Sequence, residues 1–252
     1  SSVEWTKSTT ATSFQFSNNG DYLVVGGSID DDNVEFFDTD SSTPEWTFST
    51  GDDDVDIARV DISADGNFIL SQERSSDDSY NEKLHYFSKN SSTPLWSTSG
   101  IDLRAEGRAD SDVLSSNGKY MVASTYGKIY YFESDSSTPK WSSPVSGGDC
   151  STSTHVQVSL TNDGKRIATV CDDFLSTFDD INASLEWSYE TDEQVRAVAV
   201  SADGEYIAAG SHDDKVYLFD KDSSTPLWSY ATNGNVRSVA ISANGSYIVA
   251  GT

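Results

Sequence analysis

Short runs of alternating apolar and polar residues, separated by turn residues, follow one another along the whole chain. Residues 198–201 (Val-Ala-Val-Ser) form one such run, a turn ends at Asp203-Gly204, and residues 206–210 (Tyr-Ile-Ala-Ala-Gly) form the next. Asp-Gly and Asn-Gly dipeptides tolerate a positive φ and are the strongest short-range signal of a β-hairpin. No segment keeps the apolar period of about 3.6 residues that a helix needs, so the pattern predicts strands and essentially no helix.

Three markers recur in the same order along the chain. The first is a turn that ends in Gly, at Asn19-Gly20, Asp65-Gly66, Asn117-Gly118, Asp163-Gly164, Asp203-Gly204 and Asn244-Gly245. The second is a Phe at the end of an apolar run, at Phe37, Phe87, Phe132, Phe178 and Phe219. The third is a Trp nine residues after each Phe, at Trp46, Trp96, Trp141, Trp187 and Trp228, with a further Trp5 near the start.

Each repeat therefore holds four short strands: one before the turn, one after it, one that ends in Phe and one that carries Trp. Four strands in a repeat of about 40–50 residues are typical of a β-propeller blade. We predict an all-β, single-domain β-propeller of about six four-stranded blades. The repeat units are residues 7–48, 49–98, 99–143, 144–189, 190–230, and 231–252 together with 1–6.

The last repeat is incomplete. The chain ends at Thr252 after a second strand, whereas residues 1–5 (Ser-Ser-Val-Glu-Trp) look like a fourth strand. We expect the N-terminal strand and the C-terminal hairpin to close the ring in one shared blade, because closure protects strand edges. This shared blade lacks its third strand, which leaves three interpretations open: a blade of three strands, a longer parent chain with seven blades, or a strand supplied by a neighbouring molecule.

Two segments carry a resemblance to known propeller families. Residues 219–228 (Phe-Asp-Lys-Asp-Ser-Ser-Thr-Pro-Leu-Trp) resemble the strand-loop-Trp segment of PQQ-like repeats, and residues 198–204 (Val-Ala-Val-Ser-Ala-Asp-Gly) resemble the first hairpin of WD-repeat proteins. The resemblance covers nearly the whole chain and implies the propeller fold. These families include scaffolds, outer-membrane assembly factors and quinoprotein enzymes, so the fold does not select a function. Quinoprotein dehydrogenases have eight blades, whereas this chain has six repeats, which argues against PQQ.

Loop lengths vary on only one face of the predicted disc. The first hairpin and the link from third to fourth strand are constant, whereas the other two links vary in length and lie together on the opposite face. Loops that differ on a rigid repeat scaffold are where binding usually occurs. The candidate binding residues there are Glu73, Arg74, Asp77, Asp78, Tyr80, Arg104, Glu106, Arg108, Asp149 and His155. Neutral drift of surface loops is the alternative interpretation.

Net charge narrows the choice of partner. Asp and Glu number 41 against 16 Lys and Arg, which gives a net charge of −25. Such a field repels nucleic acid and anionic membranes, and the chain has no apolar run long enough to span a membrane. We therefore expect a protein or glycan partner, no nucleic acid and no membrane insertion, and self-assembly stays open.

Sequence signatures of catalysis are missing. The histidines at 85, 155 and 212 have no zinc-site spacing, and neither a nucleophile elbow nor a phosphate-binding loop is present. Acidic runs such as 30–32 and 52–54 can bind calcium through oxygen ligands or be simple solvated turns. We expect a non-catalytic binding or assembly scaffold with no cofactor, calcium staying open. The alternatives are a subunit of a filament or surface layer, and a calcium-dependent lactonase or lyase.

Cysteine usage bears on the compartment. Cys150 precedes the first strand of the fourth repeat and Cys171 ends its second strand, so antiparallel pairing would bring them close enough for a disulfide. A disulfide would imply an oxidising compartment. Asn90 and Asn182 are glycosylation candidates because each lies in an Asn-x-Ser sequence of an exposed loop. Together with the Ser at position 1, these features favour an extracellular or cell-surface location.

Overall fold

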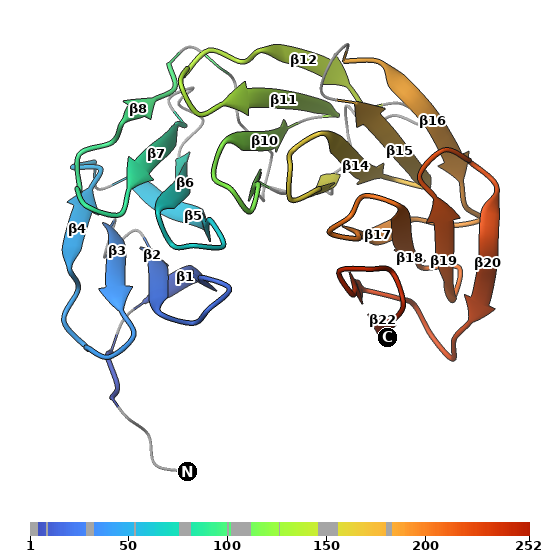
Figure 1. The fold of residues 1–252 in the computed structure, drawn as a ribbon, viewed down its shortest axis with the longest axis horizontal. Coiled ribbons are helices and arrows are strands. Elements are labelled where there is room, and N and C mark those ends of the chain that lie inside the picture. Colours follow the sequence, from blue (N-terminus) through green and yellow to red (C-terminus); the bar gives the residue numbers. More distant parts are fainter. Residues whose placement is uncertain are drawn as a thin grey trace.

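The computed structural model describes residues 5–8, 10–28, 33–52, 54–75, 82–99, 101, 112–125, 127–145, 156–179 and 183–252. All regular secondary structure in these residues is β-strand, as the sequence predicts (Figure 1). The strands form five four-stranded antiparallel sheets and one two-stranded sheet. In the described part of the chain, no helix is long and apolar enough to cross a membrane.

Each sheet is a meander of consecutive strands, and we number the sheets as blades one to six. Blade one contains β1 (Ala11–Phe16), β2 (Tyr22–Gly27), β3 (Asn33–Asp38) and β4 (Trp46–Ser49). Blade two contains β5 (Val55–Ile62), β6 (Phe68–Ser75), β7 (Leu84–Ser88) and β8 (Trp96–Ser97). Blade three contains β9 (Asp112–Leu114), β10 (Tyr120–Thr125), β11 (Lys128–Glu133) and β12 (Trp141–Pro144).

The remaining blades continue the same order. Blade four contains β13 (Val156–Leu160), β14 (Arg166–Cys171), β15 (Phe174–Asp179) and β16 (Leu185–Glu190). Blade five contains β17 (Val195–Val200), β18 (Tyr206–Ser211), β19 (Lys215–Asp220) and β20 (Pro226–Ala231). Blade six has two strands, β21 (Ser238–Ile241) and β22 (Ile248–Gly251).

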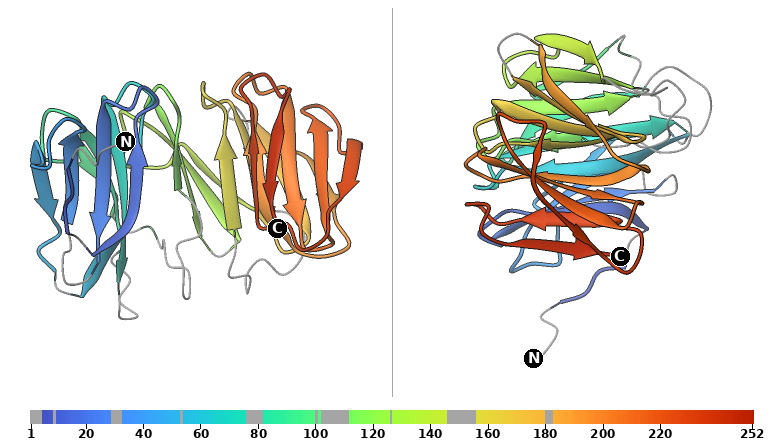
Figure 2. Two further views of the ribbon diagram at one scale, coloured as in Figure 1. Left: turned by 90° about the horizontal axis from the view of Figure 1, so that it is seen from below. Right: turned by 90° about the vertical axis from the view of Figure 1, so that its right-hand side faces the viewer.

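The blades are arranged around a common axis like the blades of a propeller. First strands lie nearest the axis and fourth strands lie at the rim (Figure 1). Because successive strands run in opposite directions, the first hairpin of each blade and its third-to-fourth loop lie on one face, which we call the turn face (Figure 2). The opposite face, where the second-to-third and blade-to-blade connections attach, is the link face.

Every first hairpin has the same turn, and blade two shows its construction. The Ser63 hydroxyl donates to Asp65 Oδ1 at 2.8 Å and accepts the Phe68 N–H at 3.0 Å. Gly66 has a φ of 72°, which favours glycine. A Cβ placed there would lie 2.2 Å from the Tyr22 ring, so an aromatic side chain of blade one occupies the space above the Gly of blade two. The same packing recurs in Phe68 on Gly118, Tyr120 on Gly164 and Tyr206 on Gly245.

Aromatic side chains also fill the space between blades near the rim. Each Phe near the end of a third strand is buried, and in four cases a Trp packs on it, which is Trp5 from the segment before blade one or a Trp of the preceding blade. The centroid distances are 6.0 Å for Trp5–Phe37, 5.4 Å for Trp46–Phe87, 6.0 Å for Trp96–Phe132 and 5.3 Å for Trp187–Phe219. Burial of one such ring contributes about 1.5–3 kcal/mol, so the repeated pattern stabilises each blade interface.

The described residues do not include the predicted closure of the ring, and residues 1–4 of the predicted closing strand lie outside them. Figure 1 shows an open arc with a gap between blade one and β22. At the two ends, Phe14 is 64% exposed and Tyr247 is 78% exposed. Trp5 packs on Phe37 of blade one, but residues 5–8 form no strand. Blade six consists of β21 and β22, and no described N-terminal residue pairs with them.

Candidate functional site

The link-face end of blade two differs from that of the other blades. β5 and β6 have eight residues each, longer than any other described strand, and β6 carries Gln72, Glu73 and Arg74 near its end. In β2 and β18, the positions equivalent to Gln72 and Glu73 are occupied by small residues, namely Gly26-Gly27 and Gly210-Ser211. We call the seven polar residues described below the blade-two cluster: Asp56, Arg59, Gln72, Glu73, Arg74, Lys83 and His85.

Glu73 and Arg74 lie in a strand, whereas the sequence placed them in an exposed loop. β6 stays paired with β5 as far as Ser75, opposite Val55, and this pairing extends the sheet. The Glu73 side chain is only 3% exposed as a result. Its predicted position in an exposed loop is therefore wrong, while its part in binding a partner stays a prediction. Arg74 keeps 38% of its side chain exposed and remains available.

A hydrogen-bonded chain links the buried Glu73 to the rim of the blade. Glu73 Oε1 lies 2.7 Å from His85 Nε2, and His85 Nδ1 lies 2.7 Å from Ser97 Oγ. Lys83 Nζ lies 3.5 Å from the other oxygen of Glu73. These contacts satisfy a carboxylate that would be costly to bury alone.

The three hydrogen-bonded residues Ser97, His85 and Glu73 are of the types found in a serine-hydrolase triad, but their position indicates a role in packing between blades. His85 and Ser97 lie directly opposite each other in the pairing of β7 with β8, so both side chains point to the same side of blade two. On that side the His85 ring packs on Phe48 of blade one, with centroids 4.9 Å apart. The histidine is 4% exposed, so it faces a neighbouring blade rather than a substrate.

Two exposed cations in the cluster are held by buried carboxylates. Arg74 Nη2 lies 2.5 Å from Oδ2 of Asp56, whose side chain is 5% exposed. Lys83 is 45% exposed, and its Nζ makes a longer contact of 3.5 Å with the buried Glu73. Because its buried partner limits the motion of each cation, these side chains lose little conformational freedom when they bind another molecule.

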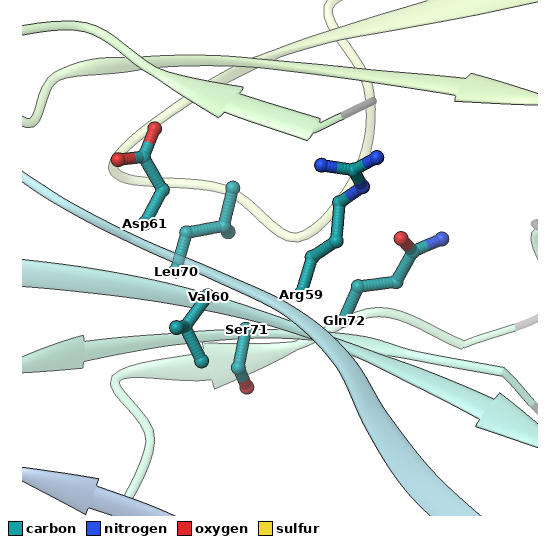
Figure 3. A pocket seen from close by; sticks show the side chains of 6 residues that line it. All are labelled: Arg59, Val60, Asp61, Leu70, Ser71 and Gln72. Carbon is teal, nitrogen blue, oxygen red and sulfur yellow. The ribbon is translucent and has the colours of Figure 1, made fainter. Parts of the chain in front are cut away.

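A hollow beside the cluster faces blade three (Figure 3). It has about 140 Å³ of empty space, part of which opens to solvent, and it is too narrow for a water molecule. Gln72, Arg59 and Asp61 point to the same side of the sheet, while Val60 and Ser71 point to the other (Figure 3). Gln72 is 1% exposed, and its amide oxygen and nitrogen have no hydrogen-bond partner among the described residues.

Asp61 connects the first strands of two neighbouring blades. Its Oδ2 accepts the Leu114 N–H of β9 at 2.7 Å, and its Oδ1 accepts the Ile62 N–H at 2.8 Å. Burial raises the pKa of Asp61 to about 6, although both hydrogen bonds and the Arg59 charge act in the opposite direction. Asp61 therefore keeps a proton under mildly acidic conditions, at which an exposed aspartate is ionised.

Most other residues selected from the sequence lie outside the described residues. These are Asp77, Asp78, Tyr80, Arg104, Glu106, Arg108, Asp149, His155, Cys150 and Asn182. Of the remaining two, Asn90 is exposed in the third-to-fourth loop of blade two. Cys171 is disulfide-bonded, and Cys150 is the other cysteine of the chain.

A second depression lies on the turn face between blades one and two. It is a shallow groove of about 340 Å³ lined by Tyr22, Phe36, Asp38, Glu45, Trp46, Lys89 and Asn90. The aromatic rings stack on one another, with centroids 5.3 Å apart for Tyr22–Phe36 and for Phe36–Trp46. Lys89 lies over the Tyr22 ring at 4.9 Å. The groove therefore exposes ring edges and charges rather than open aromatic faces.

Metal ligands do not converge in the described residues. No group of three or more His, Cys, Asp or Glu side chains there is arranged to hold a metal ion. Asp172 and Asp173 belong to the tight turn between β14 and β15, and Asp213 and Asp214 to the turn between β18 and β19. The acidic runs 30–32 and 77–78, and Asp53 of the run 52–54, lie outside the described residues.

Sequence reasoning missed most of the blade-two cluster. Asp56, Lys83 and His85 lie on strands or beside them, where a repeat protein is expected to place structural residues. A signal was nevertheless present, because Gln72-Glu73 replaces small residues at equivalent positions of other repeats. A departure from the repeat at a buried position indicates an unusual local environment as well as a difference in loop length.

Comparison with known families places the repeats described above in a known family. The family model described as outer membrane protein assembly factor BamB matches residues 80–251, which is more than half of the chain. No curated protein matches the chain.

Proposed function

The chain belongs to the PQQ-like β-propeller repeat family of the outer membrane protein assembly factor BamB, and from this premise we propose that it is a non-catalytic scaffold that binds a protein partner. Its binding surface is the link face at blade two. The family description names an assembly factor, which supports a scaffold role for this chain. In this proposal binding requires neither a cofactor nor calcium.

The observation that carries the proposal is the pair of anchored cations at the end of blade two. Arg74 and Lys83 are exposed, yet each is held by a buried carboxylate. Arg is enriched at the energetic centres of protein interfaces, and a preorganised side chain loses less entropy on binding. The strand ends equivalent to Gln72-Glu73 carry no charge in the other four complete blades, so this surface is particular to blade two among them; they are Gly26-Gly27, Ser124-Thr125, Val170-Cys171 and Gly210-Ser211.

Charge also favours this region of the surface. The net charge of −25 repels acidic molecules over most of the protein. Around Arg74, Lys83 and the exposed Arg59, positive and negative side chains alternate, so a partner meets less repulsion there. Electrostatic complementarity of this kind selects partners more than it adds affinity.

A protein fits this proposal better than a glycan or an enzyme substrate. Sugars usually stack on open aromatic faces, whereas the rings of the turn-face groove are stacked on one another and Lys89 lies over Tyr22. The Ser97–His85–Glu73 chain is turned toward blade one, which argues against a hydrolase. The disulfide at Cys171 and the exposed sequon at Asn90 support an extracellular or cell-surface location.

The proposal is tested by capturing a partner and then weakening the site. The tagged protein is cross-linked in extracts of the source cells, the partner is identified by mass spectrometry, and its affinity is measured with purified components. We expect R74Q together with K83Q to weaken binding at least tenfold, about 1.4 kcal/mol. Gln removes each positive charge but can still donate a hydrogen bond to the buried carboxylate.

The matched control removes two lysine charges from the opposite face. Lys119 and Lys165 are exposed beside the first hairpin turns of blades three and four. We expect K119Q together with K165Q to leave the affinity unchanged. An equal loss in both double variants, or full affinity in the blade-two variant, would contradict the proposed surface.

A further inference from the structure

Two arginines occupy the same position in blades five and six. Arg196 and Arg237 each lie eight residues before the glycine of the first hairpin turn in their blade. In blades one, two and four this position holds an uncharged residue, namely Thr12, Ala58 and Val156. First strands lie nearest the axis and begin at the link face (Figure 1). The two arginines therefore belong to neighbouring strand starts on the link face, close to the axis.

The backbone at this position is irregular in several blades. In the pairing of β17 with β18, Arg196 is the additional residue of a β-bulge between two consecutive residue pairs. Blades one and two have the same irregularity at Thr12 and Ala58. Bulges change the direction of a side chain and are common next to active sites. The same backbone feature therefore carries a different side chain in blade five, and the difference is a positive charge.

His212 joins the two arginines from the turn between β18 and β19. Its N–H donates to the Gln194 carbonyl at 2.8 Å, two residues before Arg196. The carbonyl of the residue before His212 accepts the N–H of Val236 at 3.0 Å, one residue before Arg237. Hydrogen bonds thus hold together the three backbone segments that carry these side chains. We call Arg196, His212 and Arg237 the arginine cluster.

Positive charge dominates the surroundings of His212. Burial lowers the pKa of His212, and the charges of Arg196 and Arg237 lower it further. Glu193 and Asp214 raise the pKa, but each acts less strongly than either arginine. The molecule as a whole has a net charge of −25, so a site where cations prevail is exceptional on its surface.

We propose that the arginine cluster binds an oxyanion, the phosphate or carboxylate group of a ligand. A guanidinium presents its N–H donors in a planar fork that matches two oxygens of such a group. Arg196 and Arg237 hold the oxyanion from neighbouring blades, and protonated His212 adds a third positive group. The cluster lies on the same face as the blade-two cluster but shares no residue with it, so the two sites are tested separately.

The site is built between blades five and six. β21 of blade six packs against both β17 and β18 of blade five. Arg196 and His212 remain partly exposed in the presence of this neighbouring blade. A further blade packed beside blade six would place Arg237 in the surroundings that Arg196 has now. The proposal therefore does not depend on the exposure of the last hairpin.

An NMR titration of the histidine ring protons measures binding through His212. The chain has three histidines, so comparison with H212Q assigns the signal. The pKa of His212 is measured in chloride alone and with inorganic phosphate or glutarate at equal ionic strength. We expect an oxyanion to raise this pKa, because a negative charge beside the ring stabilises its protonated form. A tighter response to phosphate assigns the site to a phosphate group, and a tighter response to glutarate assigns it to a carboxylate.

Two variants separate this site from a general effect of charge. Arg237 is exposed, so R237Q should fold, and an unchanged signal of the buried His85 verifies this. We expect R237Q to weaken oxyanion binding at least tenfold, because it removes a charge-assisted hydrogen bond. K119Q removes one exposed charge from the turn face and should bind as the wild type does.

Three results would overturn the proposal. The first is a pKa of His212 that neither phosphate nor glutarate raises. The second is an R237Q variant that binds the oxyanion as tightly as the wild type. The third is an equal loss of affinity in R237Q and K119Q, because the effect would then reflect net charge alone.

Discussion

The turn glycines allow a positive φ and can also leave room for an aromatic ring of the preceding blade. Gly66 has a positive φ, and the ring of Tyr22 lies where its Cβ would be. Gly20 also has a positive φ, of 78°, but nothing lies near its missing Cβ. The two positions share the backbone requirement and differ only in packing against the preceding blade.

We expect G66A to destabilise the protein more than G20A. Both variants place an L-residue in the left-handed region, which costs about 1–2 kcal/mol. Only G66A also forces Tyr22 from its site, and overpacking typically costs a further 1–3 kcal/mol. Urea unfolding of both variants measures the difference. Equal losses would show that the Tyr22 contact contributes nothing to stability.

The charge of Asp61 is strongly affected by its surroundings. Its pKa of about 6 lies above the unfolded value of 3.8, so the folded protein holds a proton that the unfolded chain has released. The stabilising contribution of this proton is complete below pH 4 and is lost as the pH rises through 6. The wild type should therefore lose stability between pH 4 and pH 7.5. We expect D61N to lose about 1–3 kcal/mol less over the same range, as measured by urea unfolding at each pH.

Asp203 provides a control of opposite sign. A hydrogen bond from Ser201 and one from the Glu205 N–H lower the pKa of this exposed carboxyl. Its stabilising contribution is present above the unfolded pKa and is lost as the pH falls. D203N should therefore lose stability at pH 7.5 but not at pH 3. The assignment for Asp61 would be wrong if D61N and D203N changed the pH dependence in the same direction.

At the scale of elements, the first hairpin of blade four ends at a disulfide. Cys171 is the last residue of β14 and is bonded, and Cys150 is the other cysteine in the sequence. A cross-link over a segment of this length stabilises a protein by about 2–4 kcal/mol, mainly by restricting the unfolded chain. We expect C171S to lose this amount. Dithiothreitol should lower the unfolding midpoint of the wild type to that of C171S and leave C171S unchanged. A reductant effect on C171S, or none on the wild type, would contradict the assignment.

β6 shows where prediction of elements from sequence reached its limit. The alternation of residues and the Asp65-Gly66 turn correctly predicted that a strand begins near Phe68. They did not predict that it continues to Ser75, because the extension depends on pairing with β5 and on the contact of Arg74 with Asp56. The partners in that pairing are up to 20 residues apart, from Val55 to Ser75, beyond the reach of a local pattern.

At the scale of the whole molecule, net charge opposes folding. The chain has 41 acidic and 16 basic residues. Folding brings the excess negative charges close together, and their mutual repulsion destabilises the compact state. We expect the urea midpoint to rise between 0.1 and 1 M sodium chloride, as the screening length falls from about 10 Å to about 3 Å. The rise should shrink at pH 4, where many carboxylates are protonated. A midpoint that does not respond to salt at pH 7.5 would mean that the repulsion is already neutralised locally.

The sequence by itself determined the local features: the order and number of the described strands, the hairpin turns and the aromatic residues between blades. These depend on contacts that recur in every repeat, so a period in the sequence reveals them. Only the tertiary structure decided that Glu73 is buried against His85 and that the Gln72 amide has no hydrogen-bond partner among the described residues. Both depend on the exact pairing of β6 with β5 and on how blade two packs against its neighbours. Neither is encoded in a short stretch of residues.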